Sequence, residues 1–127
     1  MACHAHLDSK TKAPHLQRGE TTEQLACKHL QASGLKLLQQ NYRLKMGEID
    51  LIMRDGDTIV FVEVRYRKSN RYGGALYSID PRKQMRLLRT AQHYLQSRAP
   101  NAPARFDVIA VDGSNDIHWV KNAFESC

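Results

Sequence analysis

The sequence predicts a mixed α/β domain built around one sheet. Three observations point to this class: two segments with helical periodicity, several short runs rich in Ile, Val, Leu and Phe, and an order in which strands and helices are interleaved. The predicted order is helix, strand, strand, strand, helix, strand, strand. At 127 residues the chain is long enough to bury the core of a single domain.

The first part of the chain gives a tail, a helix and a strand. Residues 1–14 are polar, lack periodicity and end at Pro14, so we expect a mobile tail followed by one domain over 15–127. From 15 to 33 the pattern is helical, with Ala26 and Leu30 on one face, and Gly34 is a plausible stop. Residues 35–42 are expected to form a strand.

The stretch over residues 46–67 predicts a β-hairpin. The apolar runs 47–54 and 58–65 flank Asp55-Gly56, a dipeptide that favours tight hairpin turns. If this dipeptide is the two-residue loop, Arg54 opposes Asp57, Asp50 opposes Phe61, Glu48 opposes Glu63 and Met46 opposes Arg65. Because side chains alternate along strands, one face then carries Glu48, Asp50, Glu63 and Arg65, and the other carries Ile49, Leu51, Met53, Val60, Val62 and Val64.

A loop, a helix and two strands complete the domain. Residues 66–79 contain Gly73-Gly74 and are expected to form an exposed loop. Asp80 is a predicted N-cap with Pro81 at the first helical position. The predicted helix has an apolar stripe at Leu87, Leu88, Ala91, Tyr94 and Leu95. After a break at 99–103, the segments 105–111 and 117–120 are predicted strands.

Composition limits the class of protein. No run approaches the ~20 apolar residues of a membrane span, and the N-terminus lacks the apolar region of a secretory signal, so we expect a cytoplasmic protein with no membrane partner. The three cysteines fit neither a disulfide framework nor a metal motif, so we expect them to be reduced. A net charge of +6 with clustered arginines is compatible with an anionic partner.

Carboxylates on the apolar hairpin are the strongest indication of function. In the predicted register Asp50 and Glu63 are diagonal neighbours, with Cβ atoms on the order of 7 Å apart. Two converging carboxylates repel one another unless a cation lies between them, and oxygen ligands suit Mg²⁺. The alternative is an edge hairpin whose acids lie in water. Against that alternative, Ile52, Ile59 and Phe61 occupy the same face.

The motifs resemble a known family. The segments "GEIDLI" at 47–52 and "FVEVRYR" at 61–67 resemble the signature of PD-(D/E)XK nucleases, nearest in style to archaeal Holliday junction resolvases. Together with Arg18-Gly19-Glu20, "YGGA", "RKQ" and "RFDV", they resemble the YraN family of uncharacterised bacterial proteins. The resemblance runs from about residue 18 to 124. It implies a restriction-endonuclease-like three-layer core, with a mixed central sheet flanked by helices.

The resemblance also implies roles for single residues. Asp50 and Glu63 would hold Mg²⁺, or Mn²⁺ in its place, and Glu20 would turn toward the metal from the first helix. Glu20 could equally be a solvated acid in a first helical turn. Glu23, one turn further on, could then turn toward the metal instead of Glu20. Glu48 would be a supporting acid or an ion-pair partner of an arginine.

Arg65 departs from the nuclease signature, which has Lys at that position. Arg stays protonated, so it cannot act as a general base, but it can hold a phosphate and stabilise charge in the transition state. The missing amine could come from Lys68 or Lys83, and the sequence does not decide between them. The substitution puts turnover in doubt more than phosphate binding.

The positively charged residues around this motif fit a nucleic acid. The expected phosphate-binding residues form one set: Arg65, Arg67, Lys68, Arg71, Arg82, Arg86 and Arg89. With this set, the resemblance implies a nucleic-acid-binding protein and an endonuclease-like activity that uses Mg²⁺ on structured or branched DNA, with DNA favoured over RNA. A homodimer would suit a resolvase acting on a junction. The alternative is a non-catalytic module that keeps the nuclease fold and recruits nucleic acid or a partner. Asp107 is expected to satisfy a buried Arg or backbone amides rather than to take part in catalysis.

Overall fold

The described residues form seven elements, in the predicted order. The computed structural model describes residues 14–67 and 79–124, with side chains described for 22–66 and 79–124. The elements are α1 (Pro14–Ala32), β1 (Lys36–Leu44), β2 (Gly47–Asp55), β3 (Thr58–Arg67), α2 (Pro81–Arg98), β4 (Ala104–Asp112) and β5 (Ile117–Phe124). The predicted tail lies outside the described residues except for Pro14, which begins α1.

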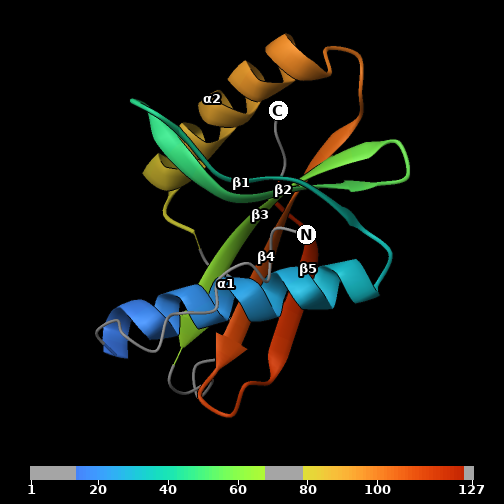
Figure 1. The fold of residues 1–127 in the computed structure, drawn as a ribbon. Coiled ribbons are helices and arrows are strands. Elements are labelled where there is room, and N and C mark those ends of the chain that lie inside the picture. Colours follow the sequence, from blue (N-terminus) through green and yellow to red (C-terminus); the bar gives the residue numbers. More distant parts are fainter. Residues whose placement is uncertain (1–13, 68–78, 125–127) are drawn as a thin grey trace.

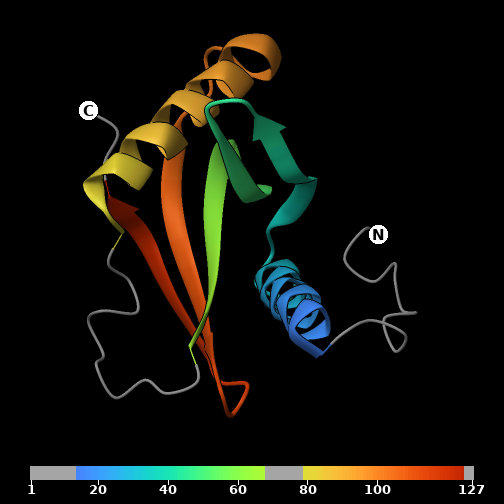
Figure 2. The same cartoon turned by 90° about the vertical axis from the view of Figure 1, so that its left-hand side faces the viewer.

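The strands form one mixed sheet in the order β1-β2-β3-β4-β5. The pairs β1–β2, β2–β3 and β4–β5 are antiparallel, whereas β3 and β4 are parallel and are connected through α2. Figure 1 shows β3 and β4 at the centre of the molecule, and Figure 2 shows α1 and α2 on opposite sides of the sheet. The predicted α/β class, with helices flanking a mixed sheet, is confirmed.

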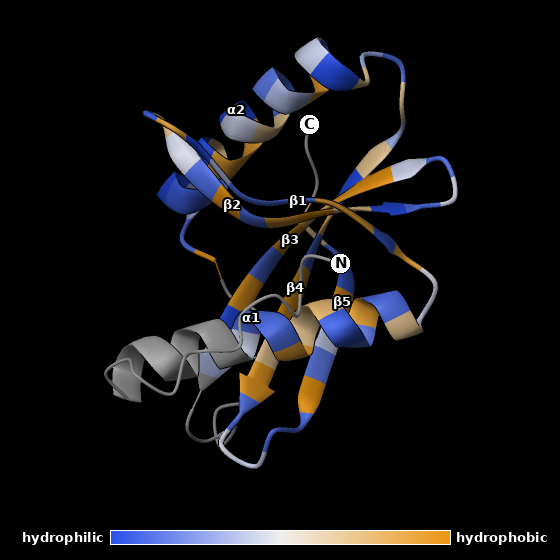
Figure 3. Ribbon diagram, viewed as in Figure 1, coloured by the Kyte–Doolittle hydropathy of each residue, from blue (hydrophilic) through white to orange (hydrophobic). Residues whose placement is uncertain are grey.

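Two apolar clusters hold the helices to the two faces of the sheet. Beneath α1 the buried cluster joins helix residues such as Ala26 and Leu30 to Leu51 and Val62 of the hairpin. Beneath α2 the other cluster joins Leu87, Ala91 and Tyr94 to strand residues including Ile52, Phe61 and Phe106. Figure 3 shows α2 to be predominantly hydrophilic, as expected for a helix that buries one stripe.

The hairpin register differs from the predicted one. Asp55 pairs with Thr58, so the two-residue turn is Gly56-Asp57, and Gly56 has a φ of +62°. Ile52 therefore pairs with Phe61, the position predicted for Asp50. The prediction was wrong because the glycine can occupy either position of a two-residue turn that requires positive φ. For most residues the predicted face is still correct. The observed register, like the predicted one, pairs even-numbered residues of β2 with odd-numbered residues of β3.

Ile49 departs from the predicted faces, and so does its neighbour Glu48, which lies on the opposite face of the strand. Ile49 packs in the cluster beneath α2 with Tyr42, its partner on β1, whereas Leu51 packs beneath α1. Between these pairs lies Asn41, whose φ is +52°. A left-handed residue inside a strand interrupts the regular alternation of side chains. The strand pair β1–β2 therefore changes face one residue before Leu51.

Helix α2 begins as predicted. The Asp80 side chain accepts a hydrogen bond from the backbone N–H of Arg82, and Pro81 is the first residue of the helix. Its buried residues are Leu87, Thr90, Ala91 and Tyr94, so Thr90 joins the predicted stripe while Leu88 and Leu95 lie at its margin.

Two other expectations concern the environment of the chain. Cys27 is fully buried and disulfide-bonded, so the expectation of three reduced cysteines is wrong; Cys3 and Cys127 lie outside the described residues. Over the described ranges, neither helix has the length and apolar character needed to cross a bilayer.

Candidate functional site

Strands β2 and β3 separate where the acids lie. The ladder between them ends at the pair Leu51–Val62, although both strands continue beyond it. Figure 1 shows β2 curving with β1 toward α2 while β3 continues beside β4. Continuing the register by one residue places Asp50 opposite Glu63. The Asp50 carboxylate (Oδ2) accepts a hydrogen bond of 2.9 Å from the backbone N–H of Val64, in place of a ladder bond.

Asp50 is the most perturbed acid of this opening. Burial, followed by the nearby negative charge of Glu63, raises its pKa from 3.8 to about 8. The hydrogen bond from Val64 opposes this rise, and the more remote charges of Glu23 and Glu48 add to it. A carboxyl that remains protonated at neutral pH beside other carboxylates marks a place where a cation would be favoured.

Glu23 reaches the same place from α1. Burial and the charge of Glu48 raise the pKa of its carboxyl, and the side chain of Asn41 hydrogen-bonds to it and opposes the rise. Glu23 thus lies near the acids of the opening, and its taking the place of Glu20 stays a prediction. Glu20 lies in α1, but its side chain is outside the described part. Asn41, the left-handed residue of β1, therefore has a second role, because its side chain hydrogen-bonds to Glu23.

Glu48 is an ion-pair residue at the rim. Its Oε2 lies 3.1 Å from Nε of Arg43, and both side chains are well exposed. Of the two arginines considered for this acid, the structure selects Arg43. Exposed pairs of this kind contribute little to stability. Glu48 therefore acts on Asp50 through its charge and not through direct contact.

Lys83 supplies a positive charge to the site. Its Nζ donates a hydrogen bond of 2.5 Å to Oε2 of Glu63, whose side chain is only 9% exposed. The lysine belongs to the first turn of α2, whereas Glu63 lies on β3. Of the two lysines considered for the missing amine, Lys83 is the one that the structure places at the acids; Lys68 lies outside the described residues.

The donor set decides which ion this site could hold. Among the described side chains, no group of three or more His, Cys, Asp or Glu residues is arranged to hold a metal ion. Asp50 and Glu63 nevertheless offer two carboxylates on adjoining strands. Mg²⁺ is commonly held by one or two carboxylates, with water and substrate phosphates completing its shell. This pair therefore fits Mg²⁺ better than it fits an ion that needs a complete cage of protein ligands.

The expected phosphate-binding residues divide between described and undescribed parts. Arg82, Arg86 and Arg89 are exposed along one side of α2, and Arg65 is half-buried on β3. Arg67 ends β3, but its side chain is outside the described part, as are Lys68 and Arg71 altogether. An exposed row of three arginines therefore adjoins the helix turn that carries Lys83.

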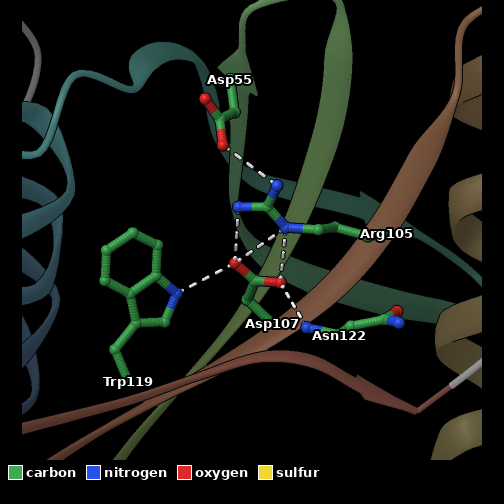
Figure 4. A network of polar contacts seen from close by, with 5 residues as sticks. All are labelled: Asp55, Arg105, Asp107, Trp119 and Asn122. Carbon is green, nitrogen blue, oxygen red and sulfur yellow. Dashed lines mark hydrogen bonds and ion pairs between the residues drawn. The ribbon is translucent and has the colours of Figure 1, made fainter.

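Asp107 belongs to a separate, structural network (Figure 4). Its buried carboxylate accepts hydrogen bonds from Nε of Arg105, from the indole N–H of Trp119 and from the backbone N–H of Asn122. Arg105 also contacts Asp55 at 3.0 Å and so connects β4 to the hairpin turn. The expectation that Asp107 satisfies an Arg and backbone amides is confirmed.

Sequence reasoning gave less weight to two residues than the structure does. Glu23 appeared only as a substitute for Glu20, and Lys83 as one of two lysines. The helical period offers a signal for Lys83, because residues 83, 87, 90, 91 and 94 follow one stripe of α2. That stripe faces the sheet, so a lysine at its N-terminal end can reach strand β3.

The fold and the site define a class of protein. It is a mixed α/β protein with two acids at the point where β2 separates from β3, which continues parallel to β4. Comparison with known proteins then gives the family. The model of uncharacterised protein family UPF0102 matches residues 22–111, and the chain belongs to this family. The predicted resemblance to YraN proteins is thereby confirmed.

The relatives match nearly the whole chain. A UPF0102 protein of Pseudomonas fluorescens (strain Pf0-1) is 56% identical over 115 residues, covering 88% of this chain and 96% of that protein. One from Nitrosococcus oceani is 52% identical, with 88% and 94% covered. One from Shewanella loihica is 47% identical, with 90% and 99% covered. Their names give the family and no activity.

Proposed function

We propose that this protein binds nucleic acid and hydrolyses its phosphodiester bonds with Mg²⁺, with structured or branched DNA as the preferred substrate. The observation that carries the proposal is the acid pair: Asp50, with a pKa of about 8, lies on the strand facing Glu63 where the hairpin opens. The preference for branched DNA rests on the resemblance of the surrounding motifs to resolvases.

The acids supply what a divalent ion needs. Asp50 and Glu63 would be its protein ligands, and Mn²⁺ would substitute for Mg²⁺. A bound divalent ion would favour the ionised form of both carboxylates and so lower the pKa of Asp50. When bound, Mg²⁺ would activate water for attack and withdraw charge from the phosphoryl oxygens.

The chain's own residues would position the substrate. The Val64 N–H donates to one oxygen of Asp50, and the other oxygen would bind the ion. Glu23 and Glu48 add negative charge, which strengthens the attraction for a divalent ion. Arg65, two residues after Glu63 on β3, would bind the phosphate through its permanent charge.

The basic side of α2 would bind the rest of the backbone. Arg82, Arg86 and Arg89 recur at helical spacing and are exposed, so they can contact successive phosphates. Such contacts carry no sequence information. We therefore expect binding that depends strongly on salt and that distinguishes substrates by shape.

A non-catalytic nucleic-acid-binding module is the second candidate. The observation favouring it is the contact between Lys83 and Glu63, which engages one of the two acids that a metal would need. In that case the basic side of α2 would still bind nucleic acid, but Mg²⁺ would have no effect. Metal binding therefore separates the two candidates.

The first test is a calorimetric titration with Mn²⁺. We expect the wild type to bind it, and Glu63→Gln and Asp50→Asn to lose that binding. Asp57→Asn, which removes an exposed carboxylate at the hairpin turn, is the matched control and should bind like the wild type. No detectable binding by the wild type, or equal binding by Asp50→Asn, would show that the acid pair is not a metal site.

The second test is a substrate panel of linear DNA, forks, four-way junctions and RNA, each with Mg²⁺. We expect the wild type to cut branched DNA, Glu63→Gln to be inactive, and Asp57→Asn to retain activity. Equal cleavage by wild type and Glu63→Gln would identify a contaminating nuclease. Metal-independent DNA binding without cleavage would favour the second candidate.

A further inference from the structure

Lys83 is on the packing side of α2, not on its basic side. The arginines at 82, 86 and 89 follow the exposed side, whereas Lys83 continues the buried stripe through Leu87 and Thr90. Its stem therefore runs beside the sheet, and its ammonium ends at the acid pair. A lysine placed only for solubility would have no reason to follow this stripe.

The partner of Lys83 is an almost buried acid. The side chain of Glu63 is 9% exposed and that of Lys83 is 45% exposed, so the pair runs from the interior to the surface. Asp50 adds a second carboxyl to the same place and interacts electrostatically with Glu63. Without a cation, the nearly buried Glu63 carboxylate would be an uncompensated charge with little water around it. The Lys83 ammonium offsets that charge.

We propose that the Lys83 ammonium is the resident counter-cation of Glu63, that it leaves Glu63 when a divalent ion binds between Asp50 and Glu63, and that it then binds the substrate phosphate. This inference rests on the proposed function. It assigns to α2 the amine that the strand lacks at Arg65, and it gives the contact between Lys83 and Glu63 a role in the metal-free protein.

Charge and reach support the exchange. A divalent ion and an ammonium on one carboxylate repel each other, and the ion gains more from two carboxylates than the ammonium gains from one. Lysine has a flexible four-carbon stem, and nearly half of the side chain is already exposed, so a small rotation moves it outward.

The decisive measurement is the affinity for Mn²⁺ in the absence of nucleic acid. Lys83→Met and the polar, uncharged Lys83→Gln should bind Mn²⁺ about fivefold more tightly than wild type, because no partly exposed ion pair has to be broken first. Lys28→Met removes an exposed lysine of α1 and is the matched control, which should leave the affinity unchanged. A purely structural lysine would give unchanged or weaker metal binding.

Cleavage of the branched substrate should change in the opposite direction. Loss of a phosphate-binding cation should lower the cleavage rate of Lys83→Met on the order of 100-fold at saturating Mg²⁺. Adding Arg65→Lys to Lys83→Met should restore part of that rate, since residue 65 follows Glu63 on the same face of β3. Circular dichroism of each variant confirms that the fold is retained.

The outcomes separate this inference from the proposed function. If the wild type binds Mn²⁺ and both Lys83 variants bind it equally or more weakly, the exchange is refuted while the metal site stands. If neither the wild type nor the Lys83 variants bind Mn²⁺, the metal site and the exchange are both refuted. Tighter metal binding together with slower cleavage supports the exchange.

Discussion

Replacing Asp50 with Asn should stabilise the metal-free protein at neutral pH. The pKa of Asp50 is about 8 in the folded chain, against 3.8 for an unperturbed aspartate. Between these values the folded state holds a proton that the unfolded state has released. The free energy of unfolding therefore falls as pH rises from about 4 to about 8. Asn does not titrate, and its carbonyl can still accept the hydrogen bond from Val64.

The size of the effect follows from the same two values. One pKa unit corresponds to about 1.4 kcal/mol, so the interval from 3.8 to pH 7 gives an upper limit of about 4 kcal/mol. Asp50 is half-buried, and water reaching its free oxygen reduces this value. We expect Asp50→Asn to be more stable than wild type by about 2 kcal/mol at pH 7.5, with the advantage reduced to nearly zero at pH 4.5.

Urea unfolding from pH 4.5 to 8 in buffer with a chelator measures this difference. Subtracting the Asp50→Asn curve from that of the wild type removes the contribution of the other titrating groups. Asp57→Asn, with its exposed carboxylate, should run parallel to the wild type. A difference that is constant with pH, or a less stable Asp50→Asn at pH 7.5, would refute the account of a buried, repelled carboxyl.

Three further predictions concern the framework around the site. Asp107→Asn should lower the free energy of unfolding by about 3 kcal/mol, because it leaves the partly buried Arg105 without its main partner. Asp55→Asn should lower it by less than about 1 kcal/mol, and equal losses for the two variants would contradict Asp107 as the main partner. Gly47→Ala should cost about 1–3 kcal/mol, since its Cβ would lie 2.8 Å from Oγ1 of Thr90; adding Thr90→Ala should recover part of the loss in thermal unfolding, and a fully additive double variant would exclude that clash. Gly56→Ala should cost about 1 kcal/mol at its φ of +62°, and an unchanged denaturation midpoint would argue against this turn.

Local signals were sufficient for most of the fold. The hairpin strands and the start of α2 at Asp80-Pro81 follow from short-range patterns of apolar, turn and capping residues. The hairpin register could not be predicted, because Gly56 fits either position of the turn. The face of Ile49 could not be predicted either, because it depends on the left-handed Asn41 across the strand pair.

The acids of the site could be predicted from the sequence, but the contact with Lys83 could not. Asp50 and Glu63 stand out because carboxylates are rare in apolar strands. The contact between Lys83 and Glu63 joins a helix to a strand 20 residues away and depends on how α2 packs on the sheet. Helical spacing narrows the choice to residues on the inward stripe, but the depth and tilt of the helix decide which of them reaches the strand.

The hydrogen bond between Asp50 and Val64 makes a backbone group a reporter of the site. The Val64 N–H is bonded to a titrating carboxylate where β2 and β3 have separated, not to a carbonyl of β2. Its nuclear magnetic resonance frequency should therefore follow the ionisation of that carboxylate and the binding of a diamagnetic ion such as Mg²⁺. One amide signal of the unmodified protein would then register both the proton and the ion.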